Sequence, residues 1–189
     1  MKKKIWLTSD THFGHDREFI WSPRGFKNVW TQDSTIIENW NSVVGPDDEV
    51  YHLGDVMLGS DLTYGLKCLK DLKGHIHIIR GNHDSLVRIA AYKNCWNVEE
   101  VCDAKYLKYK KFNFFLCHYP TLTTNLEKSP SLKEHLLCLY GHTHQKEKFY
   151  NDIPYMYNVG VDAHNCTPIL IDDIIEDMKQ KVQECMSYL

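Results

Sequence analysis

The chain has 189 residues and a mass of 22.2 kDa, and 43% of its residues are hydrophobic, so residues 1–189 fit one domain with a core of its own. The formal net charge of −3 argues against a protein that binds nucleic acid mainly through phosphate contacts, because such proteins carry a strongly basic surface. The densest basic stretch, KYLKYKK at residues 105–111, alternates lysine with tyrosine and leucine, which predicts a lysine-protected edge strand.

Short apolar runs alternate with helical patterns along the chain, without an internal repeat or a low-complexity linker. Strands are predicted at residues 4–9, 49–53, 76–80, 97–102, 112–117, 136–140, 155–160 and 168–171. Helices are predicted at residues 32–43, 61–72 and 172–186, where apolar side chains recur at helical spacing. The first half of the chain has the pattern of β-α-β units and the second half is richer in strands, which predicts sheets covered by helices.

The N-terminus and the cysteines indicate the compartment. Three lysines open the chain, but only Ile5, Trp6 and Leu7 follow before polar residues begin, which is too short for a signal peptide or a membrane span. The seven cysteines stand singly and form no CxxC motif, so a zinc finger or a redox pair is disfavoured. We expect a soluble, cytoplasmic protein with reduced thiols.

Five predicted strands end in residues of the types that bind metals. In chain order these residues are Asp10 and His12, then Asp55, then Asn82, His83 and Asp84, then His118, and finally His142 and His144. Ligand crevices form at the carboxyl ends of strands in open α/β sheets. Each residue alone has an ordinary explanation as a helix cap, a turn or a buried polar residue. Independent turns have no reason to favour ligand types at five strand ends, so the set predicts a cation site.

Other histidines are expected to have ordinary roles. His75 and His77 have the same spacing as the pair at 142 and 144, but they lie where a predicted strand begins. They are therefore expected at the opposite end of the sheet from the crevice. His52 has the position of a buried strand residue that supports the site.

The series Asp-x-His, Gly-Asp, Gly-Asn-His-Asp, a lone His and Gly-His-x-His, between residues 10 and 144, resembles the motifs of the calcineurin-like metallophosphoesterases. The stretches TSDTHFGH, IENWNSVV and VYHLGD are most similar to the small, single-domain members from bacteria and their phages. The resemblance implies an α/β (α+β) fold, a four-layer αββα sandwich with two mixed β-sheets, and a dinuclear metal centre.

The resemblance also assigns the metal ligands. Asp10, His12 and His144 would hold one ion, Asn82, His118 and His142 the other, and Asp55 would bridge the two. A bridging position needs a carboxylate, which has two oxygens to share. Mixed imidazole and carboxylate ligation disfavours Mg²⁺. We expect two divalent ions and favour Mn²⁺, with Fe, Zn, Co or Ni as alternatives.

The implied activity is hydrolysis of a phosphate ester. In the family a hydroxide that bridges the two metals attacks phosphorus, and the His of Gly-Asn-His, here His83, is the proposed general acid. His83 and Asp55 are thus the expected catalytic residues, although His83 could instead orient a ligand. A phosphodiester is favoured over a small phosphomonoester. The alternative function is a non-catalytic scaffold that keeps the fold for protein binding.

The substrate is less constrained by the sequence. The chain lacks the second Asp and the Asp-Arg-Gly that follow the Gly-Asp motif in protein serine/threonine phosphatases, which disfavours a phosphoprotein. The aromatic segment 13–30 contains Arg17 and Arg24, and an arginine can clamp phosphate while aromatic rings stack on bases. Arg24, Arg17, His15 and His164 are candidate substrate-binding residues, with an exposed, unemployed arginine as the alternative. The expected partner is a phosphate-ester substrate, which includes derivatives of nucleotides or nucleic acids. We expect no association with a membrane, and the sequence does not predict the oligomeric state.

Overall fold

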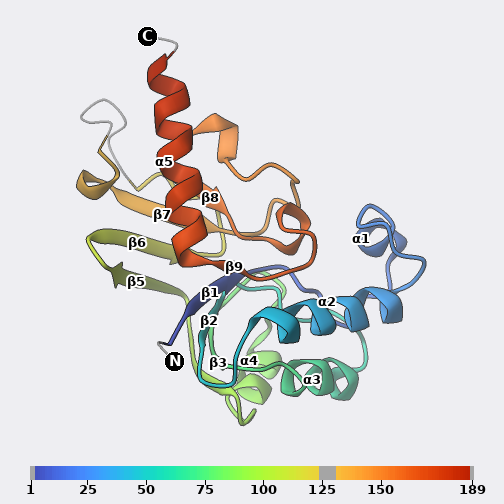
Figure 1. The fold of residues 1–189 in the computed structure, drawn as a ribbon. Helices are drawn as coiled ribbons and strands as arrows, with labels where there is room; N and C mark the ends of the chain where they lie inside the picture. Colours follow the sequence, from blue (N-terminus) through green and yellow to red (C-terminus); the bar gives the residue numbers. More distant parts are fainter. Residues whose placement is uncertain (1–2, 124–130, 188–189) are drawn as a thin grey trace.

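The computed structural model describes residues 3–123 and 131–187, whose strands form two mixed sheets (Figure 1). The five-stranded sheet has the order β4-β3-β2-β1-β9. Its strands are β1 (Ile5–Thr8), β2 (Glu49–His52), β3 (His75–Ile79), β4 (Val98–Cys102) and β9 (Ile169–Leu170). Strands β1 to β4 are parallel, whereas β9 pairs antiparallel to β1. The carboxyl ends of the parallel strands therefore lie at one edge of this sheet.

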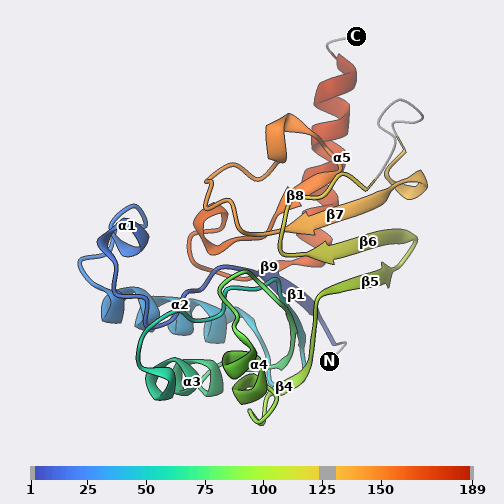
Figure 2. The same cartoon turned by 180° about the vertical axis from the view of Figure 1, so that it is seen from behind.

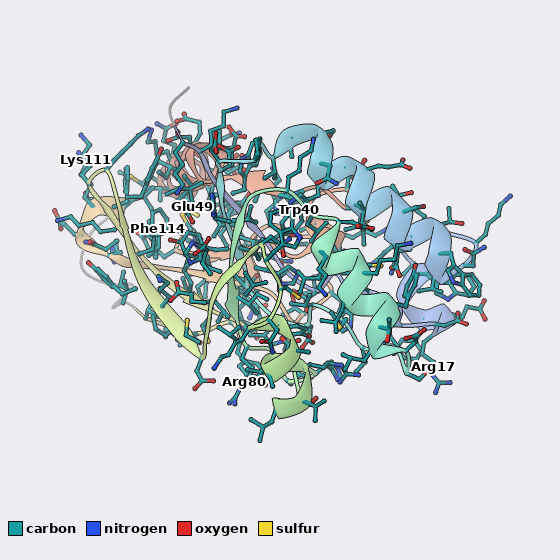
Figure 3. The ribbon with its side chains drawn as sticks, turned by 90° about the horizontal axis from the view of Figure 1, so that it is seen from below. Arg17, Trp40, Glu49, Arg80, Lys111 and Phe114 are labelled. Atoms are coloured by element: carbon teal, nitrogen blue, oxygen red, sulfur yellow. The ribbon has the colours of Figure 1, made fainter. Side chains whose placement is uncertain are left out.

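The four-stranded sheet has the order β5-β6-β7-β8. Its strands are β5 (Ala104–Tyr109), β6 (Phe112–Cys117), β7 (Leu136–Tyr140) and β8 (Met156–Asn158). Strand β5 pairs antiparallel to β6, and the other pairs are parallel. Strand β5 lies at the edge of the sheet, which confirms the lysine-protected edge strand predicted at residues 105–111. The β5–β6 hairpin, marked by Lys111, lies at the far end of the molecule from Arg17 (Figure 3).

Helices cover one face of the five-stranded sheet. They are α2 (Val29–Val43), α3 (Leu62–Lys70) and α4 (Leu86–Tyr92), and the short α1 (Glu18–Trp21) projects beyond them (Figures 1 and 2). The core on this face contains Trp6, Val50, Ile76 and Ile78 of the sheet with Ile36, Trp40 and Leu69 of the helices. Burial of these apolar side chains is the main stabilising term of the layer.

The opposite face of the five-stranded sheet faces the second sheet and α5 (Ile171–Ser187). Leu7, Leu53 and Ile79 share a core with Phe114, Leu116, Leu137 and Leu139 of the four-stranded sheet, and with Ile174 and Met178 of α5. Figure 1 shows α5 passing across the second sheet. No helix among the described residues is long and apolar enough to cross a membrane.

The mixed α/β fold with two mixed sheets confirms the fold class predicted from the sequence. The eight strands predicted from apolar runs, the edge strand predicted at residues 105–111 and the three predicted helices are all present, with ends that differ by a few residues. Helices α1 and α4, with 4 and 7 residues, were not predicted, because so few turns give no clear apolar periodicity. The parallel register of β1, β2 and β3 brings the loops after these strands together at the same sheet edge.

Candidate metal centre

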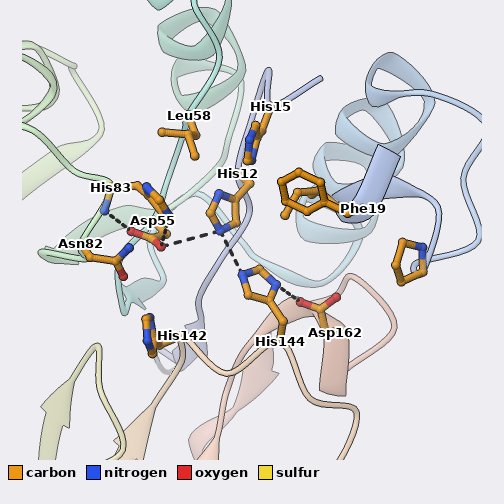
Figure 4. Close-up of a pocket in the computed structure, with 12 residues that line it drawn as sticks. His12, His15, Phe19, Asp55, Leu58, Asn82, His83, His142, His144 and Asp162 are labelled. Atoms are coloured by element: carbon orange, nitrogen blue, oxygen red, sulfur yellow. Dashed lines mark hydrogen bonds and ion pairs between the residues drawn. The ribbon is translucent and has the colours of Figure 1, made fainter. Parts of the chain in front are cut away.

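Side chains from both sheets converge at the carboxyl ends of their strands (Figure 4). Two groups of residues could each hold a metal ion, and within each group the ligand atoms lie within 4.8 Å of one another. The first group is Asp10, His12 and His144, and the second is Asp55, His118 and His142. The first group contains the three residues expected to hold one ion. The second combines Asp55, the expected bridge, with His118 and His142, and the remaining expected ligand, Asn82, lies beside it with Oδ1 3.0 Å from His118 Nε2.

The first group has spacings suited to a cation. His12 Nε2 lies 3.2 Å from His144 Nε2, and each of these nitrogens lies 3.9 Å from Asp10 Oδ1. Ligands bound at about 2.1 Å are separated by roughly 3.0 to 3.4 Å, so these atoms are close to the spacing of a coordination shell. Asp10 Oδ1 is buried and has no hydrogen-bond partner among the described residues. An unpartnered buried carboxylate oxygen is costly without a cation, so the residues fit a metal.

The second group is built around His118. Its Nε2 lies 3.0 Å from Asn82 Oδ1, 3.2 Å from His142 Nδ1 and 3.4 Å from Asp55 Oδ2. The same Asp55 oxygen lies 3.7 Å from His12 Nε2 of the first group. Asp55 Oδ2 therefore stands between the two groups, and Asn82 offers a neutral amide oxygen to the second.

Hydrogen bonds on the far side of two imidazoles orient their ligand nitrogens. His118 Nδ1 donates to the Leu53 carbonyl oxygen at 2.7 Å, and His144 Nδ1 lies 3.0 Å from Asp162 Oδ2. Each bond places the proton on Nδ1 and leaves the Nε2 lone pair facing the site, as in carboxylate–histidine–metal arrangements. Asp162 was not identified as a site residue from the sequence, because Asp162 belongs to none of the motifs.

Five of the proposed ligands have a left-handed backbone. Asp10, His12, Asp55, His142 and His144 have φ values between 51° and 70°. This conformation costs about 1–2 kcal/mol for a residue with a Cβ and is found mainly where function requires it. Five of the ten left-handed residues other than glycine in the described part of the chain lie at this one point, which supports a functional site.

Two glycines of the motifs are required by close contacts. A Cβ on Gly81 would lie 2.2 Å from Asp55 Oδ1, and a Cβ on Gly141 would lie 2.4 Å from Asp10 Oδ2. Neither glycine has a positive φ, whereas Gly54 does, at 94°. The first two glycines therefore let the carboxylates approach the neighbouring backbone, and Gly54 permits a left-handed turn.

Electrostatics favour the ligand forms of Asp55 and His12. Burial opposes the charge of Asp55, but the hydrogen bond and charge of His118 and the His83 backbone N–H, at 2.8 Å, lower the pKa of Asp55 to about 2. Burial and the neighbouring His144 shift the pKa of His12 well below its usual value. Asp55 is therefore a carboxylate and His12 a neutral imidazole at neutral pH, the forms that bind cations.

A buried carboxylate fixes the loop that carries the second ligand group. Asp84 accepts hydrogen bonds from the backbone N–H groups of Asp55, at 2.8 Å, and Gly81, at 2.9 Å. The Tyr92 hydroxyl of α4 donates to its other oxygen at 2.8 Å. Asp84 therefore ties the loop after β2 to the loop after β3, and helix α4 supports both.

The site opens into a cavity of about 640 Å³. It is lined by His12, His15, Phe19, Ile20, Pro23, Asp55, Leu58, Asn82, His83, His142, His144 and Asp162. The His83 side chain is 43% exposed, and its Nε2 lies 4.0 Å from Asp55 Oδ2. His83 thus reaches the cavity beside the proposed ligands, and His15 lines the same space.

The structure corrects two predicted substrate contacts and leaves a third without support. Only 2% of the Arg24 side chain is exposed, and its guanidinium binds Asp162 and donates to the Asp10 carbonyl, so it cannot clamp a substrate from the cavity. His164 donates from Nε2 to the Asn158 carbonyl at 2.8 Å and does not line the cavity. Arg17 is exposed at the start of α1 and is also absent from the lining.

The other histidines have the ordinary roles predicted for them. His52 is fully buried, with Nε2 3.0 Å from the Thr11 hydroxyl. His75 lies against Glu99, with Nδ1 2.6 Å from the carboxylate, and His77 contacts two further glutamates. Both stand on β3 at its amino end, away from the cavity.

Comparison with known proteins identifies the family. Residues 4–165 match the calcineurin-like phosphoesterase superfamily domain. The uncharacterised protein MJ1445 of Methanocaldococcus jannaschii is 31% identical over 179 residues, which cover 92% of this chain and 90% of that protein. The gene 66 protein of Mycobacterium phage D29 is 28% identical over 200 residues, covering 95% of this chain and 98% of that protein.

Solved structures agree with the fold. A protein of unknown function from Aquifex aeolicus, AQ665, superposes with a TM-score of 0.72 at 26% identity, covering 93% of this chain and 99% of that chain. The E. coli phosphoesterase YfcE superposes with a TM-score of 0.51 at 18% identity, covering 83% of this chain and 78% of that chain. With a family match over most of its length and a site that has the family's ligand types, the chain belongs to the calcineurin-like phosphoesterase superfamily.

Proposed function

We propose that this protein, as a single domain, is a dinuclear metal-dependent hydrolase that cleaves a phosphodiester, with a small phosphomonoester as the second choice. The observation that carries the proposal is the position of one carboxylate oxygen. Asp55 Oδ2 lies 3.7 Å from His12 Nε2 and 3.4 Å from His118 Nε2, so one oxygen can serve both ligand groups. Such an oxygen would let Asp55 contribute to both sites if two ions were bound.

The ligand roles follow from which atoms face the site. Asp10, His12 and His144 would hold one ion, Asn82, His118 and His142 the other, and Asp55 would bridge. When bound, a pair of divalent ions supplies Lewis-acid activation of water and stabilises charge on the phosphoryl oxygens. We propose Mn²⁺ as the ion, because the nitrogen and oxygen donors suit Mn, Fe, Zn, Co and Ni better than Mg.

His83 is the proposed general acid. Its backbone N–H is held on Asp55 Oδ1 at 2.8 Å, while its side chain reaches the cavity without joining either ligand group. A proton donor needs a position beside the leaving oxygen, and the exposed His83 imidazole has such a position at the edge of the proposed ligands. Asp55 would position His83 by this bond and hold the metals by its other oxygen.

Two cavities support a diester over a monoester. On the other side of Asn82 lies a second cavity of about 520 Å³, lined by Arg80, Gly81, Asn82, Asp84, Ser85, Leu86, Asp103, Cys117 and Tyr119. Asn82 lines both cavities. A phosphate bound at the ligand groups therefore has room for an ester arm on each side, including the arms of a nucleotide or nucleic-acid derivative.

The non-catalytic scaffold is the second candidate, and the complete ligand set argues against it. A binding module has no need for five ligand residues in a costly left-handed backbone. It also has no need for an exposed imidazole beside them. An activity assay separates the phosphoesterase from the scaffold.

The experiment that tests the proposal is hydrolysis of bis-p-nitrophenyl phosphate and p-nitrophenyl phosphate by metal-stripped protein with Mn²⁺ added back. We expect turnover that requires metal, is abolished in Asp55→Asn and falls at least about 100-fold in His83→Ala, in line with the size of general-acid effects. The matched control is His75→Ala, which removes a histidine at the end of β3 away from the cavity. This variant should retain full activity. Binding of two metals without turnover of either ester would favour the scaffold.

A further inference from the structure

We propose that the end of the cavity formed by α1 binds a planar, uncharged aromatic group, such as a nucleobase or an aryl ring, on one ester arm of the substrate. The inference rests on the proposed phosphoesterase function and names the substrate class for it. Phe19, Ile20 and Pro23, from residues 18–23, form this end together with Leu58 from the loop after β2. We call these four residues the apolar wall.

The apolar wall is continuous with the metal ligands. The His15 ring lies 5.4 Å from the ring of the ligand His12, and the Phe19 ring lies 5.8 Å from His15 at an interplanar angle of 88°. Figure 4 shows Phe19 at the opposite side of the cavity from Asn82. A phosphate at the ligand groups would therefore place one ester arm along His15 and against the Phe19 ring.

Phe19 is available for such a contact. Its side chain is 70% exposed, whereas the adjacent Ile20 is buried. An exposed aromatic face beside a cavity gains from stacking on a planar group, because every aromatic ring and base offers such a face.

Charge disfavours an anionic group at the same end. Arg24 has its guanidinium on Asp162 and on the Asp10 carbonyl, and neither Arg24 nor the exposed Arg17 lines the cavity. Asp162 does line the cavity and contributes a carboxylate. Among the described residues, the cavity lining therefore includes no lysine or arginine to pair with a second phosphate or a carboxylate, and the arm that the apolar wall holds is expected to be uncharged.

The test compares two phosphonates that cannot be hydrolysed. Phenylphosphonate and methylphosphonate carry the same anionic group and differ in the aromatic ring. Isothermal titration into the Mn²⁺-loaded protein should show phenylphosphonate binding at least tenfold more tightly. In Phe19→Ala this preference should fall below about threefold, while methylphosphonate binding and the metal stoichiometry stay the same. Trp30→Ala removes an exposed aromatic of α2 outside the cavity and should keep the preference.

The outcomes separate this inference from the function on which it rests. Equal binding of the two phosphonates by the unaltered protein would overturn the aromatic site and leave the phosphoesterase proposal intact. A preference that survives Phe19→Ala would show that Phe19 and the apolar wall do not bind the aromatic group. If neither phosphonate binds the metal-loaded protein, the phosphate-ester function itself fails, and the inference fails with it.

Discussion

Replacing Asp162 by asparagine tests whether a residue outside the motifs controls the first metal site. Asp162 Oδ1 lies 2.8 Å from Arg24 Nε, and Oδ2 lies 2.9 Å from Arg24 Nη2 and 3.0 Å from His144 Nδ1. Asparagine keeps the volume of the side chain but removes its charge. The buried Arg24 then lacks its counter-ion, and His144 lacks the carboxylate that fixes its Nδ1–H.

The size of the effect follows from the electrostatics of Asp162. Burial opposes its charge, but the hydrogen bonds and charges of His144 and Arg24 lower its pKa from 3.8 to about 2, which corresponds to roughly 2 kcal/mol of folding free energy. The folded-state pKa is depressed, so this stability is present above about pH 4 and is lost as the pH falls toward 2. Asp162→Asn should therefore lower the free energy of unfolding at pH 7 by about 2–3 kcal/mol.

The affinity for metal separates a positioning role of Asp162 from a general effect on stability. Loss of a carboxylate behind a histidine ligand typically weakens metal affinity by about 10–100-fold. Mn²⁺ titration of Asp162→Asn should show one site weakened by this factor and the other unchanged. The matched control is Asp177→Asn, which removes a carboxylate paired with Lys148 and Tyr157 away from the cavity. Two unchanged metal affinities in Asp162→Asn, with a loss of stability alone, would refute the positioning role of Asp162.

The remaining predictions concern the loops behind the ligands. Gly81→Ala should reduce hydrolysis of bis-p-nitrophenyl phosphate by at least about 100-fold, because its Cβ would lie 2.2 Å from Asp55 Oδ1. The control is Gly25→Ala, whose Cβ meets nothing within 4 Å and which should cost only about 1 kcal/mol of stability from its positive φ. Equal activity of the two variants would contradict the expected clash between the Cβ at position 81 and Asp55. Tyr92→Phe should lower the free energy of unfolding in urea by about 1–2 kcal/mol, because Asp84 loses a buried donor; an unchanged urea midpoint would contradict this. Chelation of the metals should lower the melting temperature by several degrees, as expected when a ligand of the native state is removed, and Asp55→Asn should abolish that difference.

The meeting of the candidate ligands at strand ends was predictable in part from local rules. Parallel strands leave a sheet edge at the same end, which brings together Asp10, Asp55 and Asn82, each just beyond such a strand. The parallel pairing of β6 with β7 does the same for His118 and His142 in the second sheet. The meeting of the two sheets is a long-range feature that strand direction does not give, and the division of these residues between two ions is what the resemblance to the family implies.

The environment of Arg24 was not predictable in the same way. Arg24 and Asp162 are separated by 138 positions in the sequence, and no periodicity or spacing links them. An arginine in a Pro-Arg-Gly loop has the sequence features of an exposed residue, but in the fold its side chain is buried and paired with Asp162. Burial of this kind depends on which surfaces meet in the fold, which a single sequence does not specify.

Contacts between the ligand loops explain how the protein holds a costly backbone. Asp10 N–H donates to the Gly54 carbonyl and His12 N–H to the Asp55 carbonyl, both at 3.0 Å, and His142 N–H donates to Asp10 Oδ2 at 2.9 Å. These bonds join the loops after β1, β2 and β7 directly to one another. Five left-handed residues cost roughly 5–10 kcal/mol in all, comparable to the net stability of a domain. Because each loop satisfies the backbone groups of the next, one loop cannot relax to an ordinary conformation without breaking the hydrogen bonds of its neighbours, and the ligand geometry is a property of the whole set.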